Sequence, residues 1–265
     1  HGYHSFPSMH AFLSKGKIPF VFSTHYHGRS HSAFRNILLK FYRPFGRRMV
    51  EKSDCIFLVS SAEEKLLNSH FQPRQSLVIH NGHSAPSNWK EKKIGSVVSI
   101  GRLESYKNHD KVIQCVLKNK DLTLDIIGDG PEFQNLSDMV RDGGGEGRII
   151  LHGIVDDERK WEILSSASCL VSMSEIESFG IVLVEGASMG ARIVASDIPS
   201  HREISETIGG FEVVDVKDEE GIERSILANS KGDGSDYSGM ANFDWEEITS
   251  RYVRMYERVI TKKSQ

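Results

Sequence analysis

The alternation of short apolar runs with amphipathic segments from Gly95 onward most constrains the fold of this 265-residue chain. Strands that are apolar throughout and are separated by helices form parallel sheets covered on both faces. The sequence therefore predicts an α/β fold with a six-stranded doubly wound parallel sheet in this region. The expected strands are Ser96–Ile100, Leu122–Ile127, Arg148–His152, Cys169–Met173, Arg192–Ala195 and Phe211–Val214. The expected helices are Asp110–Leu117, Glu132–Arg141, Glu158–Ser166, Ile181–Met189, His201–Ile208 and Asp218–Asn229.

The first 83 residues repeat this pattern less completely and predict about half of a second doubly wound sheet. The expected strands are Pro19–Ser23, Cys55–Val59 and Ser76–His80, and the expected helices are Ser8–Lys15, His31–Met49 and Ala62–His70. Proline lacks a backbone N–H, so we expect the second helix to be interrupted at Pro44. We predict an incomplete Rossmann-like domain at 1–83, a complete one at 84–241 and a C-terminal helical segment at 242–265.

The formal net charge of -3 hides an asymmetry between the two regions. Residues 1–88 hold 11 Lys and Arg against 4 Asp and Glu, whereas the remainder holds 22 against 32. This division indicates domains with different partners, and the acidic remainder argues against nucleic acid as a partner. The three cysteines form no CxxC pair, and no apolar run is long enough to span a membrane. We therefore expect a reducing, cytoplasmic compartment, with the inner face of the membrane as one location within it.

The loops after two predicted strands carry the residues that suit a phosphorylated ligand. Open α/β sheets bind ligands beyond the carboxyl ends of their strands. The loop after the first strand of the sheet contains Arg102 and Lys107, two cations that can neutralise a diphosphate. The alternative for this pair is two solvated surface charges.

The loop after the fourth strand places Gly180 directly before an apolar helix. Such a helix start presents free N–H groups and a positive dipole end to an anion, and glycine lets the backbone approach closely. Glu177 and Glu185 flank this helix start, and carboxylates beside a phosphate are best used to bind hydroxyl groups. The alternative is that Glu177 caps the helix while Glu185 is exposed.

These motifs together resemble family 4 of the glycosyltransferases, which has the GT-B architecture of two Rossmann-like domains. The resemblance is in order along nearly the whole chain. It rests on Glu177-Ser-Phe-Gly with Glu185, Ser99-Ile-Gly-Arg102 with Lys107-Asn, Asp125-Ile-Ile-Gly-Asp129-Gly-Pro131, Leu151-His-Gly153-Ile-Val155 and Asn242-Phe-Asp-Trp245. In this family the final helix packs back on the first domain, so the resemblance implies the same for 242–265.

The resemblance implies a role for each residue of the donor site. Arg102 and Lys107 would hold the donor diphosphate and stabilise the leaving nucleotide. Glu177 would contact the sugar hydroxyls or the developing oxocarbenium charge, and Glu185 would bind the ribose. The remaining donor-binding residues are Gly101 in the diphosphate loop, His152 and Ile154 near the base, and Phe179, Gly180 and Ile181 at the sugar and phosphate. No metal or other cofactor is expected, and the donor is a UDP-sugar or a GDP-sugar.

His25 is the fourth expected catalytic residue, beside Glu177, Arg102 and Lys107. It follows a strand in Phe22-Ser-Thr-His25-Tyr-His27-Gly28, which resembles the segment in which the family's histidine faces the reacting sugar. A metal pair with His27 and a purely structural loop histidine are the alternatives. The stretch Arg29–Lys52 is basic and aromatic, which suits an anionic membrane or a lipid phosphate, or else an ordinary amphipathic helix. The expected acceptor-side or membrane-side residues are His27, Arg29, Arg35, Arg43 and Arg47.

The resemblance implies a retaining hexosyltransferase of surface-glycan synthesis that uses a nucleoside-diphosphate sugar, a glycan or lipid-linked acceptor and no metal. It also implies that roughly 90 residues, the first βαβ half of the acceptor domain, are absent here. A homo-oligomer or another chain is then an expected partner. The alternatives are a non-catalytic or partner-dependent nucleotide-sugar-binding subunit and, with a poorer fit, an epimerase or a phosphorylase.

Overall fold

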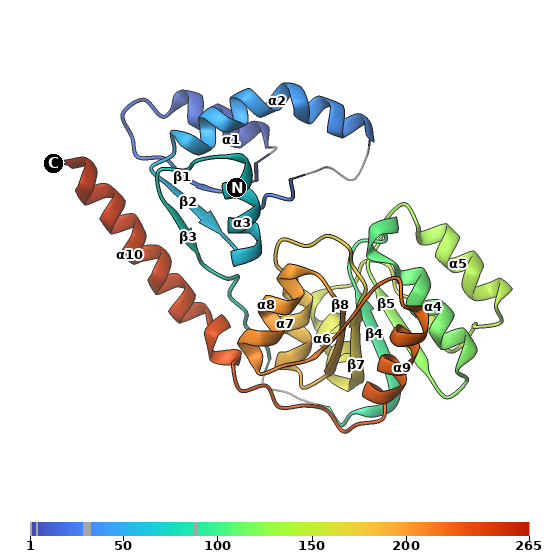
Figure 1. Ribbon diagram of the computed structural model, residues 1–265. Helices are drawn as coiled ribbons and strands as arrows, with labels where there is room; N and C mark the ends of the chain where they lie inside the picture. The colour runs from blue at the N-terminus through green and yellow to red at the C-terminus, as the bar shows by residue number, and fades with distance from the viewer. Residues whose placement is uncertain (1, 4, 29–32, 87–89, 265) are drawn as a thin grey trace. The chain divides into compact units, whose positions relative to one another are not determined.

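The computed structural model describes residues 2–3, 5–28, 33–86 and 90–264, without the side chains of 33–40 and 262–264. The chain forms two compact units (Figure 1). One unit joins His1–Gly82 with Phe243–Gln265, and the other comprises His83–Asn242.

The second unit is built on a six-stranded parallel sheet, which confirms the fold predicted for this region. The strand order is β6-β5-β4-β7-β8-β9, so the order reverses between β4 and β7. Val97 of β4 lies opposite Leu124 of β5 on one side and Cys169 of β7 on the other. The strands are β4 (Lys93–Ile100), β5 (Thr123–Ile127), β6 (Ile149–Leu151), β7 (Ala167–Ser172), β8 (Arg192–Ser196) and β9 (Glu212–Val214).

Helices cover both faces of this sheet, because its strands are apolar on both sides. One face carries α4 (His109–Lys118), α5 (Phe133–Asp142) and α9 (Glu219–Asn229), and the other carries α6 (Asp157–Ser166), α7 (Ile181–Ser188) and α8 (Pro199–Ile208) (Figure 1). Short 3₁₀ turns occur at Ser105–Lys107 and Met240–Phe243. The core on the α4 side includes Val112, Val116, Leu136 and Ile226 packed against β4, β5 and β7.

The first unit contains a smaller parallel sheet of three strands in the order β1-β2-β3. The strands are β1 (Val21–Ser23), β2 (Cys55–Leu58) and β3 (Ser76–Val78), and the helices are α1 (Phe6–Ser14), α2 (Ala33–Glu51), α3 (Ser61–His70) and α10 (Trp245–Ser264). Ile56 and Leu58 of β2 face a core formed with Phe12, Met49 and Leu67. The alternate residues Cys55 and Phe57 face Ile248, Met255 and Val259 of α10. The helix at the end of the chain therefore covers the opposite face of this sheet from α2 and α3.

The prediction that Pro44 interrupts its helix was wrong. α2 continues through Pro44 as one helix of 19 residues. An internal proline removes one helical hydrogen bond. Met49 and Val50 are fully buried and Tyr42 and Phe45 are packed against the same core. Burial of these side chains along one face offsets the lost bond. Among the described residues, no helix is long and apolar enough to cross a membrane.

Candidate functional site

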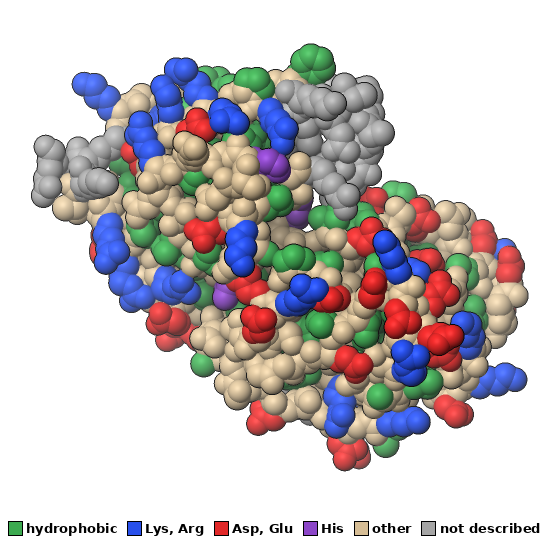
Figure 2. Space-filling model, in the orientation of Figure 1, with side chains coloured by type: hydrophobic (Ala, Val, Ile, Leu, Met, Phe, Trp, Pro, Cys, Tyr) green, Lys and Arg blue, Asp and Glu red, His purple; other side chains and the backbone are tan. Residues whose placement is uncertain are grey.

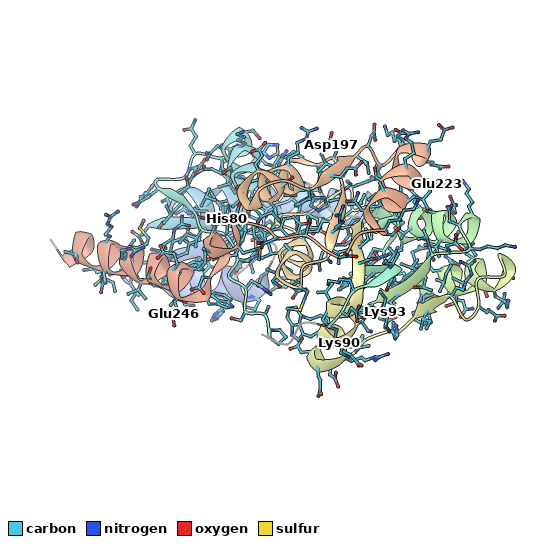
Figure 3. The ribbon with its side chains drawn as sticks, turned by 90° about the horizontal axis from the view of Figure 1, so that it is seen from below. His80, Lys90, Lys93, Asp197, Glu223 and Glu246 are labelled. Carbon is cyan, nitrogen blue, oxygen red and sulfur yellow. The ribbon has the colours of Figure 1, made fainter. Side chains whose placement is uncertain are left out.

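The carboxyl edge of the second unit's sheet is built from loops that bond directly to one another. Figure 3 labels Lys93 at the amino end of β4 and Asp197 just beyond the carboxyl end of β8, which marks the two edges. The backbone N–H of Glu175 donates to the Tyr106 carbonyl (2.9 Å), and the Asn108 side-chain amide donates to the Met173 carbonyl (2.9 Å). The loops after β4 and β7 are thus joined where the strand order reverses, which is where open α/β sheets bind ligands.

Asn108 holds this junction in place, a role that was not predicted from the sequence. Its φ of 52° is left-handed, a conformation that asparagine tolerates better than most residues. It lies between the 3₁₀ turn and α4, so the change of direction there depends on it. An asparagine two residues before the predicted helix Asp110–Leu117 was the available signal.

Lys107 and Glu177, two of the predicted catalytic residues, form an ion pair across the joined loops. Their side chains are 15% and 19% exposed, so the pair is largely shielded from water. A Cβ at Gly101 would lie 3.6 Å from the Lys107 ammonium, which places the predicted diphosphate loop against the same cation. The structure therefore brings Gly101, Lys107 and Glu177 together.

Gly180 begins α7 in a left-handed conformation, with φ 105° and ψ 50°. No side chain caps this helix start among the described residues, and the Leu183 N–H donates to the Gly180 carbonyl at 2.9 Å. The positive end of α7, with the Ile181 and Val182 amides, suits an anionic ligand. Phe179 is 4% exposed and is the buried residue that precedes the turn. Ile181 is the first residue of α7. The turn follows Glu177 by three residues, so the ion pair and the helix start belong to one loop.

His201 lies directly behind the Gly180 turn and was not identified from the sequence as a site residue. A Cβ at Gly180 would lie 3.2 Å from Cδ2 and 3.3 Å from Nε2 of the His201 ring. His201 Nδ1 lies 3.0 Å from the Ser196 carbonyl oxygen, so Nδ1 carries the proton and donates it. Nε2 is buried and has no hydrogen-bond partner among the described residues. Burial lowers the pKa of His201 to about 4, so the ring is neutral at pH 7.

The second buried histidine of this edge, His109, behaves in the same way. Its Nδ1 lies 3.0 Å from the Ser99 hydroxyl. Burial and the neighbouring Lys107 charge lower the pKa of His109 to about 4. Two neutral imidazoles therefore lie beneath the loops that carry Lys107 and Gly180.

These two histidines predict a loss of stability in mild acid. An unfolded histidine has a pKa of about 6.5, so between that value and about 4 the unfolded chain binds more protons than the folded one. Their contribution is complete above pH 6.5 and is lost as the pH falls. We expect the free energy of unfolding to fall by about 2 kcal/mol per histidine between pH 7.5 and pH 5. Urea denaturation at the two pH values measures this, and His201→Asn should remove about half of the histidine contribution. An unchanged pH dependence in that variant would contradict the prediction.

Arg102, the other predicted diphosphate ligand, is turned outward. Its guanidinium pairs with Glu104 at 3.0 Å, and its side chain is 71% exposed. The structure thus does not place it on the Lys107–Glu177 pair, although both cations lie in the loop after β4. An exposed arginine on a loop can reorient at little cost, since its ion pair is solvated.

Glu185 is paired with Lys160 of α6 at 3.0 Å, and their side chains are 13% and 19% exposed. Lys160 was not identified from the sequence as a site residue. His152 contacts Asp125 of the neighbouring strand at 2.6 Å, which fixes the ring at the carboxyl ends of β5 and β6. Ile154, two residues on, is 82% exposed and offers an apolar surface beside this pair.

His25 lies in the first unit, in the loop that follows β1. It is half-buried with a φ of 46°, and burial lowers the pKa of its side chain. Arg43 is exposed on α2, and Arg47 contacts Glu51 at 3.3 Å and the His70 carbonyl at 3.1 Å. His27 lies in the same loop as His25. Arg29 lies outside the described residues, and the backbone of Arg35 belongs to α2 while its side chain is outside them.

Comparisons with known proteins find glycosyltransferases. A phosphatidylinositol N-acetylglucosaminyltransferase GPI3 subunit of Saccharomyces cerevisiae is 25% identical over 218 residues, covering 78% of this chain and 47% of that protein. A phosphatidyl-myo-inositol mannosyltransferase of Mycolicibacterium smegmatis is 28% identical over 180 residues, covering 62% of this chain and 45% of that protein. The structure of HepE from Anabaena in complex with UDP and glucose matches with a TM-score of 0.75 at 17% identity, covering 95% of this chain and 74% of that one.

The chain thus spans about half the length of the two curated relatives named above, and its fold is that of the GT-B glycosyltransferases. A family model described as Glycosyltransferase Family 4 matches residues 1–84. A second model, described as Glycosyl transferases group 1, matches residues 83–231. Since this second match covers more than half of the residues, the chain belongs to the group 1 glycosyl transferases.

Proposed function

We propose that the chain transfers a hexose from a nucleoside-diphosphate sugar to a hydroxyl of a glycan or a lipid-linked acceptor, with retention of configuration. The observation that carries this proposal is the Lys107–Glu177 pair beside the uncapped start of α7. A cation and the positive end of a helix suit a diphosphate, while a carboxylate suits the hydroxyls of a sugar attached to it.

The donor diphosphate would replace Glu177 as the ion-pair partner of Lys107. Arg102 would turn inward to complete the diphosphate-binding site. Both cations and the positive end of α7 then neutralise the charge that develops on the leaving nucleotide, which is the role that a metal ion has in other transferases. Preorganised groups of this kind need little rearrangement during the reaction.

The transfer we propose is a front-face attack. The acceptor hydroxyl oxygen forms a bond to the anomeric carbon as the bond from that carbon to the β-phosphate oxygen breaks. The electron pair of the broken bond stays on the phosphate oxygen, which takes the proton of the acceptor hydroxyl. Glu177, released from Lys107, would bind sugar hydroxyls or the oxocarbenium charge, and attack by its carboxylate is the lesser alternative.

The nucleoside would lie along the ends of β5 and β6. Ile154 offers an exposed apolar side chain for the base, beside the fixed His152–Asp125 pair. Glu185 keeps Lys160 as its counter-ion, so its remaining lone pairs can accept from ribose hydroxyls without an unpaired charge beside the diphosphate. The structure of HepE that this fold resembles contains UDP and glucose, which supports a UDP-sugar donor.

The acceptor side would be formed by the first unit. Figure 2 shows Lys and Arg side chains gathered on the visible face of this unit. Arg43 and Arg47 of α2 are exposed. Phe41 on the same helix is 80% exposed. Two relatives carry names that specify phosphatidylinositol lipids as acceptors, which supports an anionic lipid for this surface.

A partner-dependent nucleotide-sugar-binding subunit is the second candidate. Among the described strands β1 pairs only with β2. The Gly2 and Tyr3 N–H groups already bond the Ser23 and Thr24 carbonyls (2.9 and 2.7 Å), so another chain would add a strand along the rest of this edge. The Saccharomyces relative is itself named as a subunit. Release of nucleotide from a donor sugar by this chain alone would exclude this candidate.

Thermal unfolding with UDP-, GDP- and ADP-sugars tests the donor site. We expect one class of nucleotide sugar to stabilise the protein by about 2.7 kcal/mol at 100 times its dissociation constant. The matching free monosaccharide, which has no diphosphate, should give no shift and serves as the control. If the unfolding temperature with every nucleotide sugar equals that of the protein without ligand, the proposal is overturned.

A further inference from the structure

Glu63 is a buried carboxylate in the first unit and has no assigned role in donor or acceptor binding. It lies in the first turn of α3, and the residue is 3% exposed. Its Oε1 accepts hydrogen bonds from the Thr24 hydroxyl (2.6 Å) and from the Tyr26 backbone N–H. Its Oε2 accepts from the Val59 backbone N–H (2.9 Å). Burial raises the pKa of this carboxyl, while the three donors oppose that rise.

The two donors that share Oε1 lie on either side of His25. The φ of His25 is 46°, and among the described residues only Asn108 is another non-glycine residue with positive φ. A left-handed conformation costs a residue with a Cβ roughly 1–2 kcal/mol, so it persists only where the surroundings fix it. Glu63 bonds the Thr24 hydroxyl and the Tyr26 backbone N–H and thereby holds the residues on both sides of the histidine.

These contacts reach beyond the helix cap. The cap residue Ser60 accepts from the Glu63 N–H at 3.0 Å. The Glu63 carboxylate also accepts from the Val59 N–H, one residue before the cap, and from the loop after β1. It therefore joins the carboxyl ends of β1 and β2 at the histidine loop.

We propose that Glu63 is the positioning residue of His25: its bonds to the Thr24 hydroxyl and the Tyr26 N–H hold the loop that sets the orientation of the imidazole. This inference rests on the proposed function and adds to it that His25 takes part in transfer, as the resemblance to the family implies. Glutamine has the same shape but presents an NH₂ group to one set of donors, so Glu63→Gln must break at least one of the three bonds.

Glu63→Gln should lower kcat for transfer by about 10- to 100-fold, because a small misplacement of a catalytic group has an effect of that size. The dissociation constant for the nucleotide alone should not change, since its expected ligands lie in the other unit. The matched control is Glu64→Gln, the next residue of α3, whose carboxylate accepts from the Ser76 hydroxyl at 2.7 Å and does not bond the histidine loop. It should leave both quantities unchanged.

A double-mutant cycle with His25→Ala separates positioning from a general loss of stability. If Glu63 acts through His25, Glu63→Gln should have little further effect once His25 is alanine. If the loss of kcat in the double variant equals the product of the losses in the two single variants, the proposal is overturned. Should Glu63→Gln fail to fold, Thr24→Val removes one donor to Oε1 with little change in volume, and the same non-additivity with His25→Ala is expected.

The NMR resonance of the His25 ring, assigned by its disappearance in His25→Ala, gives a measurement that does not depend on activity. It should shift in Glu63→Gln and stay in place in Glu64→Gln. An unshifted resonance in Glu63→Gln overturns the positioning role even in an active enzyme. If the wild-type chain shows no transfer but the resonance shifts in Glu63→Gln, the transfer reaction is refuted and the contact between Glu63 and the His25 loop is not.

Discussion

Replacement of Lys107 by alanine is expected to lower transfer from a nucleotide sugar by about 100- to 1000-fold, the range found when one preorganised charge-stabilising group is removed. The loss has two causes. The diphosphate loses its shielded cation, and Glu177 remains beside it as an unpaired carboxylate. Steady-state kinetics with the preferred donor measures the effect, and calorimetry with the free nucleotide separates its binding part.

Two further variants make this expectation specific. Lys111→Ala removes another lysine of the same unit, one that pairs with Glu219 at 3.4 Å on the surface of α4, and it should change transfer little. Lys107→Ala combined with Glu177→Gln should recover part of the nucleotide affinity, because the repulsion is gone, but should not recover transfer. Wild-type affinity and rate in Lys107→Ala would remove the main support for the proposed donor site.

Replacement of Gly180 by alanine is expected to weaken donor binding by at least about 10-fold, because a left-handed residue with a Cβ costs roughly 1–2 kcal/mol. The added Cβ would also lie 3.2 Å from the His201 ring, a contact that pushes the turn toward the ligand. Both effects displace the amides at the start of α7. Isothermal titration with the nucleotide sugar measures the loss.

Gly147→Ala is the matched control, because this glycine has a φ of 82° and open space around its Cβ position. It carries the conformational strain without the contact and lies away from α7, so donor affinity should stay at the wild-type value. His201→Ala introduced together with Gly180→Ala should restore part of the affinity by removing the clash. Equal weakening by Gly147→Ala and Gly180→Ala would mean that the effect comes from global stability.

The alternation of apolar strands with helices was enough to predict the six-stranded sheet, because each element is encoded by its own local pattern. The resemblance to a known family then indicated which loops to inspect. Pro44 shows the limit of local rules. The apolar face of α2 keeps the helix intact, and the strength of such packing is set by residues elsewhere in the chain.

Side-chain pairings in the candidate site were less predictable. Lys107 and Glu177 are 70 positions apart, and Lys160 and Glu185 are 25 apart. Each carboxylate had been assigned to a ligand, yet in this structure each has a lysine partner from another loop or helix. Such pairs depend on the register of neighbouring strands and on how helices lie over them, which one sequence does not specify. The place of His201 could not be predicted either, because its ring belongs to the site only through its packing against Gly180 in the folded chain.

In the Lys107–Glu177 pair each charge already has a counter-ion when no ligand is bound. In the proposed donor site a ligand would have to replace Glu177 as the partner of Lys107 before its hydroxyls could reach the carboxylate, and only an anionic ligand can do so. A free monosaccharide has no such charge, so Glu177 would stay paired with the lysine. Discrimination against unactivated sugars would then begin as an ion exchange, ahead of any test of shape.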